Sequence, residues 1–147
     1  MDYFKKDPYS FEKCVTEITR MMDKNIVDYE LTRRWADGGR DAIGKYRIGN
    51  KDSSIYVDIA LEAKCFSFSN AVTMKVTSRL ISRLRRRQIG ILVTASYLHQ
   101  QAYKEIIEDQ HLVIIIASED IANILKNSGY GKERDVKKWL KQFPREK

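Results

Sequence analysis

The chain has 147 residues, of which 43% are hydrophobic, so it is not a disordered chain and fits one compact domain over residues 1–147. Its formal net charge of +7 favours an anionic partner such as nucleic acid. The two cysteines stand in no zinc-ligand pattern, no secretory signal opens the chain and no apolar run reaches the length of a membrane span, so we expect a cytoplasmic protein without a membrane partner.

Hydrophobic periodicity predicts the elements of the first half of the chain. A helix, a strand and the two strands of a hairpin are expected over residues 9–24, 26–31, 41–48 and 55–65. A glycine-rich turn over residues 36–44 leads into the hairpin. In its returning strand, Glu62 and Lys64 stand two residues apart and therefore project from the same face.

The second half of the chain alternates helices with short apolar strands. Helices are expected over residues 70–88, 98–109, 119–127 and 134–142, and strands over residues 90–95 and 111–117. Apolar strands that alternate with helices are typical of parallel pairing. The predicted fold class is therefore α/β, with a mixed β-sheet flanked by helices in the order helix, three strands, helix, strand, and further helices towards the C-terminus.

Two acids and a lysine form the candidate catalytic site. Mg²⁺ is usually held by one or two carboxylates together with water and substrate phosphate, and Mn²⁺ can take its place. Asp41 begins one hairpin strand and Glu62 lies near the end of the other, so both carboxylates can reach one ion, with the backbone carbonyl of Ala63 as a further ligand. The ammonium of Lys64 can orient an attacking water or balance developing charge.

Surface charge is the alternative interpretation of these residues, because a Glu-x-Lys tripeptide is common by chance. Three features favour a site: the acid and the lysine end an apolar strand, where unpaired charge is costly, the glycine turn leads directly into Asp41, and a basic helix follows immediately. Asp37 flanks the same glycines and is the alternative metal ligand. Asp58 shares the face of Glu62 but lies two pleats away, so we expect it to be peripheral.

A block of positive charge follows the hairpin. No acid occurs between Ala63 and Lys104, and helical spacing aligns four bases of that block into a strip, namely Lys75, Arg79, Arg83 and Arg86. We expect this strip to bind DNA phosphates without reading sequence, and the alternative is a solvated helix edge or salt bridges to the first helix. Farther along, Ser96 is expected to cap the helix that follows the strand at residues 90–95.

A resemblance to a known family rests on segments that occur in the order FEKCVTEIT, WADGGRDAIG, ALEAKCF, a basic helix, GILVTASYLHQQAYKEI and HLVIIIASEDIANIL. Over about residues 10–126 the chain resembles the Mrr-type restriction endonuclease catalytic domain of the PD-(D/E)xK nuclease superfamily. That superfamily also includes archaeal-type Holliday junction resolvases. The chain departs from the superfamily's motif label in having Arg40 instead of proline before Asp41, which is common, and some relatives have glutamine in place of Glu62.

The resemblance implies a restriction-endonuclease-like fold and a Mg²⁺-dependent DNA endonuclease that leaves a 5′ phosphate. It implies Asp41 and Glu62 as metal ligands and Lys64 as the catalytic lysine. It also implies a catalytic acid in the first helix, for which Glu17 is preferred over Glu12 because it stands farther into the helix.

The expected partners follow from this function. Double-stranded DNA is the expected substrate, and a homodimer is expected because a double-strand cut by domains with one site each needs two copies. No specificity domain is recognisable, so target choice would fall to a separate domain or subunit of a larger restriction enzyme. The alternatives are a Holliday junction resolvase-like nuclease and a catalytically inactive DNA-binding or assembly module, against which the intact set of Asp41, Glu62 and Lys64 argues.

Overall fold

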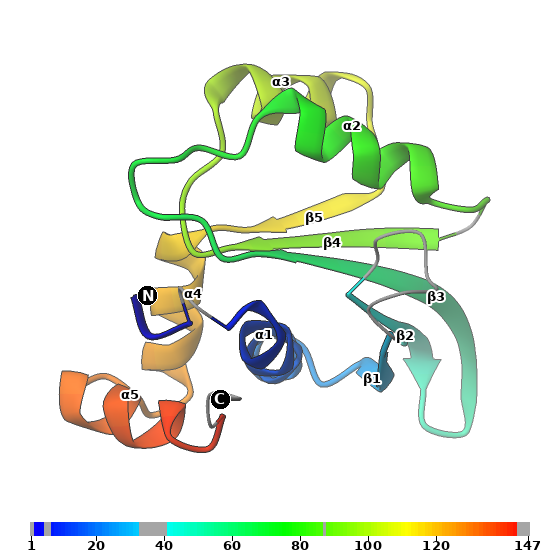
Figure 1. Ribbon diagram of the computed structural model, residues 1–147. Coiled ribbons are helices and arrows are strands. Elements are labelled where there is room, and N and C mark those ends of the chain that lie inside the picture. The colour runs from blue at the N-terminus through cyan, green and yellow to red at the C-terminus, as the bar shows by residue number, and fades with distance from the viewer. Residues whose placement is uncertain (1, 5–6, 33–40, 87, 144–147) are drawn as a thin grey trace.

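The computed structural model describes residues 2–4, 7–32, 41–86 and 88–143. Its centre is a five-stranded sheet in which the strands stand in sequence order (Figure 1). The strands are β1 Ile26–Leu31, β2 Ala42–Asn50, β3 Ser53–Lys64, β4 Gln88–Thr94 and β5 Val113–Ile116. The pairs β1–β2 and β2–β3 are antiparallel, whereas β3–β4 and β4–β5 are parallel. This confirms the predicted mixed sheet with parallel strands in the second half of the chain.

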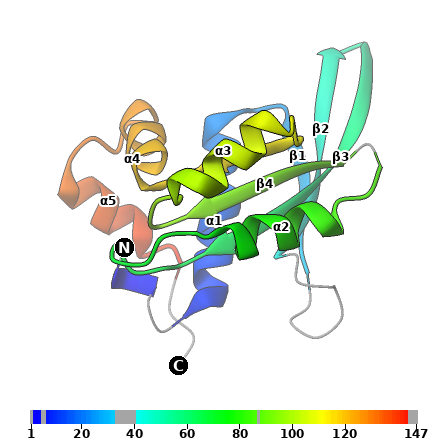
Figure 2. The same ribbon diagram turned by 90° about the horizontal axis from the view of Figure 1, so that it is seen from above.

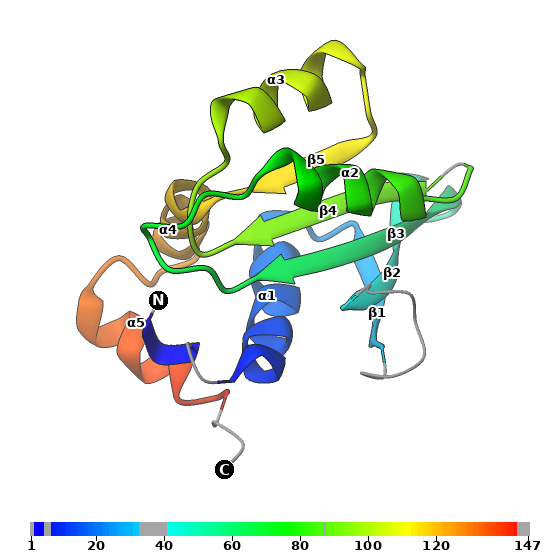
Figure 3. The same cartoon turned by 45° about the horizontal axis from the view of Figure 1, so that its top comes forward.

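Helices cover both faces of this sheet. After the short 3₁₀ helix η1 (Asp2–Phe4), the helices are α1 Pro8–Met22, α2 Met74–Arg83, α3 Gln100–Glu108, α4 Ser118–Asn127 and α5 Glu133–Leu140. In Figures 1 and 3, α2 and α3 lie on one side of the sheet, and α1 lies on the other side with α4 and α5 near it. The order α1, three strands, α2, β4 is the predicted one. None of the helices formed by the described residues is long and apolar enough to cross a bilayer.

The larger hydrophobic core lies between α1 and the sheet. Asp7 caps α1 by accepting hydrogen bonds from the backbone N–H and the hydroxyl of Ser10, and Pro8 occupies the first turn, where no N–H is needed. The buried apolar side chains of this helix are Phe11, Cys14, Val15 and Ile18. They pack in one cluster with buried residues of β3 and β4, namely Ile59, Leu61, Ile91 and Val93. Alternation along β3 therefore turns its other side chains towards α2.

Helix α2 is shorter than the predicted helix over residues 70–88. Val72 forms a parallel bridge with Leu98, so the chain before Thr73 is extended. At the other end Leu84 has ψ 127°, and Gln88 already begins β4. Helical spacing of apolar and basic residues continues beyond both ends, but the chain must leave the helix to rejoin the sheet, and that requirement decides the boundaries.

The β2–β3 hairpin extends beyond the rest of the sheet (Figure 2). Its turn uses Gly49, whose φ of 111° suits glycine and whose substitution would place a Cβ 2.4 Å from the carbonyl oxygen of Ser53. The antiparallel register runs from Asn50 opposite Ser53 back to Ala42 opposite Leu61. This register brings the start of β2 beside the end of β3, which positions the candidate site.

Candidate active site

Glu62 and Lys64 lie together beneath α2 at the end of β3. Their neighbour Leu61 is buried in the core against α1, so the two charged side chains project from the opposite face. Lys64 Nζ lies 2.7 Å from Glu62 Oε1. The structure thus confirms that the two residues share a face and adds that they form an ion pair.

The carboxylate of Glu62 is fully buried, and its two oxygens differ in their surroundings. Oε1 accepts a hydrogen bond from Arg79 Nη2 at 2.6 Å and also faces the ammonium of Lys64. Oε2 is buried and has no hydrogen-bond partner among the described residues. A buried carboxylate is costly unless it is paired, so two cations compensate the charge while one oxygen keeps its full capacity to accept a ligand.

Asp41 is fixed across the end of β3 by backbone hydrogen bonds. Its N–H donates to the carbonyl of Leu61 at 2.9 Å, and its Oδ2 accepts from the N–H of Ala63 at 2.6 Å. Burial raises the pKa of Asp41, the Ala63 N–H and Lys64 oppose that rise, and the negative charge of Glu62 adds to it. The hydrogen bonds of Asp41 to Leu61 and Ala63, the residues on either side of Glu62, place the two acids at neighbouring strand ends. We call Asp41, Glu62, Ala63, Lys64 and Arg79 the Glu62 cluster.

The Glu62 cluster suits a divalent cation. No group of three or more His, Cys, Asp or Glu side chains arranged to hold a metal occurs within the described ranges. Mg²⁺ requires fewer protein ligands than that, because one or two carboxylates with water and substrate oxygens complete its coordination. Two neighbouring carboxylates, one of them with an unpartnered buried oxygen, are the donor set that such an ion would stabilise.

Residues at the end of β4 fix the backbone at Lys64. The hydroxyl of Thr94 and the N–H of Ala95 both donate to the Lys64 carbonyl at 3.1 Å. Ser96 donates its N–H to the Thr94 hydroxyl and its own hydroxyl to the carbonyl of Asn70. The prediction that Ser96 caps the following helix is wrong, because His99 is the N-cap of α3. The carbonyls that accept from the Thr94 and Ser96 hydroxyls lie 30 and 26 residues earlier in the chain, so the sequence alone did not indicate these contacts.

The four residues of the predicted DNA-binding strip have different surroundings in the structure. Arg79 turns towards the sheet and pairs with Glu62, which sequence reasoning missed. Lys75 and Arg86 are exposed, and Arg83 is half-buried. The sequence offered one indication of the Arg79–Glu62 pair. A helix with long cationic side chains follows directly after the strand that holds the acid. Binding of DNA by the strip stays a prediction.

The other candidate acids lie outside the Glu62 cluster or outside the described residues. Glu17 pairs with Arg20 on α1, its side chain is 41% exposed, and no hydrogen bond or ion pair within the described part of the chain joins it to the cluster. Its catalytic role stays a prediction that this geometry does not support. Asp58 lines a separate pocket of about 370 Å³ with Arg85 and Gln88, in keeping with a peripheral place. Asp37 lies outside the described residues.

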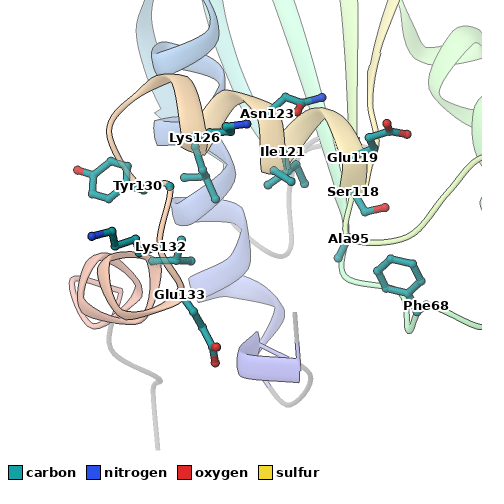
Figure 4. A pocket seen from close by; sticks show the side chains of 14 residues that line it. Phe68, Ala95, Ser118, Glu119, Ile121, Asn123, Lys126, Tyr130, Lys132 and Glu133 are labelled. Atoms are coloured by element: carbon teal, nitrogen blue, oxygen red, sulfur yellow. The ribbon is translucent and has the colours of Figure 1, made fainter.

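A larger cavity of about 730 Å³ lies away from these acids, between α4, the turn before α5 and Phe68 (Figure 4). Its wall includes the apolar side chains of Ile121, Leu125 and Val136 and no member of the Glu62 cluster. This larger cavity and the charged cluster are therefore different places in the fold.

The raised pKa of Asp41 gives a testable pH dependence of stability. Folding favours the protonated acid, so this contribution to stability is present below the ordinary value of 3.8 and is lost as the pH rises through the raised folded value. Asp41→Asn keeps an acceptor for the Ala63 N–H but stays neutral. In urea denaturation with EDTA between about pH 4 and 7, wild type should lose stability relative to this variant as the pH rises. A relative gain for wild type would contradict the burial effect.

Comparison with known proteins places this geometry in a family. The family model Mrr_cat, described as restriction endonuclease, matches residues 4–125. The solved structure of the DNA modification-dependent restriction endonuclease AspBHI is 44% identical over 95% of this chain, with a TM-score of 0.86. A second solved structure, of the MspJI restriction endonuclease in complex with a 27-mer oligonucleotide, is 26% identical over 97% of the chain, with a TM-score of 0.79.

The chain spans about a third of these solved proteins, 36% of the first and 33% of the second. Among curated protein sequences no match is found. The family model nevertheless covers most of the chain, and the mixed sheet with its flanking helices is the fold of both solved relatives. The chain therefore belongs to the Mrr-type restriction endonuclease family.

Proposed function

We propose that this domain hydrolyses phosphodiester bonds of double-stranded DNA with Mg²⁺, for which Mn²⁺ can substitute, as a PD-(D/E)xK endonuclease. The observation that carries the proposal is the unpartnered, buried Oε2 of Glu62, with the Lys64 ammonium 2.7 Å from the other carboxylate oxygen and Asp41 hydrogen-bonded to the residues on either side of Glu62. A buried carboxylate with an unpartnered oxygen lowers the stability of the metal-free domain. Binding of a cation to that oxygen would account for a carboxylate being kept at this position.

The residues of the Glu62 cluster take distinct roles. The carboxylates of Asp41 and Glu62 and the carbonyl of Ala63 would hold the ion. A bound divalent cation supplies positive charge at the scissile phosphate and lowers the pKa of a water molecule. Lys64, held at the same end of β3, would donate hydrogen bonds to the attacking water or to a non-bridging phosphate oxygen on which negative charge develops. Thr94 keeps the Lys64 backbone in place.

The DNA would approach from the α2 side of the sheet. Lys75 and Arg86 are exposed on and just beyond that helix, and phosphate contacts from such side chains position a duplex without reading its sequence. We propose that the target is chosen outside this chain, by a specificity domain or subunit, and that two copies act together to cut both strands. Because the 44% identical relative is a DNA modification-dependent enzyme, modified DNA is the natural target that we propose.

Cleavage assays test the proposal directly. Methylated and unmethylated plasmid and a four-way junction are incubated with the purified chain in Mg²⁺, Mn²⁺ or EDTA, beside Asp41→Asn. We expect metal-dependent cleavage of duplex DNA that EDTA and Asp41→Asn abolish. Cleavage that persists in EDTA would overturn the metal assignment, and cleavage confined to the junction would instead support a resolvase. DNA binding without cleavage under every condition would support an inactive binding module.

A further inference from the structure

We infer that Arg79 is a displaceable counter-ion of Glu62: its guanidinium neutralises the buried carboxylate in the metal-free domain and weakens binding of the divalent cation until it moves away. The inference deepens the proposed function, on which it rests, by naming a residue that regulates the same site. It adds a second role to the one that the sequence suggested for Arg79, whose position on the helix alone indicated a phosphate contact.

The charges of the Glu62 cluster balance without a metal. The carboxylates of Asp41 and Glu62 contribute two negative charges, and Lys64 and Arg79 contribute two positive charges, both within hydrogen-bonding distance of Glu62 Oε1. A divalent cation at Oε2 of the same carboxylate would lie a few ångströms from both side chains, where like charges repel strongly because Glu62 is wholly buried. Entry of the cation is therefore favoured when one positive side chain leaves.

Arg79 is the side chain that can leave. Its side chain is 48% exposed, against 18% for Lys64, which β3 and the hydrogen bonds to its carbonyl hold at the strand end. Helix α2 does not depend on Arg79 for its attachment, because Leu80 and Thr77 are buried beneath it at 1% and 2% exposure. The guanidinium can thus turn to solvent or to a DNA phosphate while the helix remains in place.

Metal binding to the full chain without DNA tests this inference. Calorimetric titration with Mn²⁺ compares wild type with Arg79→Met, which keeps much of the aliphatic stem and removes the charge. We expect Arg79→Met to bind Mn²⁺ roughly three- to tenfold more tightly, because one repelling charge is gone and solvent screens the rest. Arg79→Lys restores the charge and should bind like wild type. Lys75→Ala, which removes a charge from the same helix, should leave the affinity unchanged.

Thermal melting gives a second measurement that does not depend on activity. With EDTA, Arg79→Met should melt below wild type because the buried carboxylate loses a partner, and the rise in Tm on adding Mn²⁺ should be larger than in wild type. A residue that only supports the fold would lower the melting temperature in EDTA without increasing the response to metal.

The outcomes separate this inference from the proposed function. If Glu62→Ala abolishes Mn²⁺ binding but Arg79→Met binds Mn²⁺ as wild type does or more weakly, the counter-ion role is wrong and the metal site stands. If wild type binds no Mn²⁺, or if Glu62→Ala leaves binding unchanged, the metal site itself is wrong and the inference falls with it.

Discussion

Lys64→Met is expected to reduce DNA cleavage by about 10³-fold or more, because a positioned ammonium at the reacting phosphate is difficult for solvent to replace. The side chain lies beside Glu62 at the end of β3, and methionine keeps its approximate length while removing the charge. Cleavage is measured as single-turnover rates on plasmid DNA with saturating Mg²⁺, so that slow product release does not hide the loss.

A chemical role for Lys64 requires that metal binding survives the substitution. Removing a positive charge next to Glu62 should keep or strengthen Mn²⁺ binding, so the variant should be loaded with metal but slow. Lys104→Met is the matched control, since Lys104 is exposed on α3 and pairs with Glu108. A Lys64→Met variant that cleaves within about tenfold of wild type would remove Lys64 from the mechanism.

Glu62→Ala is expected to abolish both metal binding and cleavage, and to destabilise the metal-free domain. The substitution deletes the buried carboxylate that pairs with Lys64 and Arg79. Breaking a fully buried pair costs about 3–5 kcal/mol, but both cations here reach water, so we expect a loss of about 1–3 kcal/mol. Urea denaturation in EDTA measures this loss, and the Mn²⁺-dependent rise in stability should vanish.

Glu62→Gln completes a graded series with the alanine variant. Glutamine has nearly the same shape and offers one oxygen, and some relatives have glutamine at this position, as the family resemblance indicated. We therefore expect metal affinity and cleavage between those of wild type and Glu62→Ala. If Glu62→Ala cleaves as fast as wild type, the carboxylate is a structural partner of the two cations and the site lies elsewhere.

The Glu62 cluster contains buried charge and an unpartnered oxygen, both of which lower the stability of the fold. Burial raises the pKa of Asp41, and one oxygen of Glu62 is unpartnered among the described residues. Such groups are retained in proteins where they have a task, because neutral or apolar replacements of similar shape are usually more stable. The raised pKa of Asp41 and the unpartnered oxygen of Glu62 therefore favour a functional site at the end of β3, within the segment that the family model matches.

The sequence determined those features that depend on one element or on neighbouring strands. Alternation along β3 placed Glu62 and Lys64 on one face, and the short turn of the hairpin brought Asp41 to the end of the same strand. Even the bounds of β1, residues 26–31, followed from alternation. These predictions succeeded because the period of a strand and the register of a hairpin are set by local backbone geometry.

The tertiary structure alone decided how α2 and the loops meet the sheet. Arg79 and Glu62 are 17 residues apart, and the Thr94 hydroxyl contacts a carbonyl 30 residues earlier in the chain. Which side of α2 faces β3 depends on how Leu80 packs against the sheet, and a long side chain such as Arg79 can reach several partners from one backbone position. Periodicity assigns a side chain to one face of its own helix. Only the packing of that helix against the sheet determines which residue the side chain contacts.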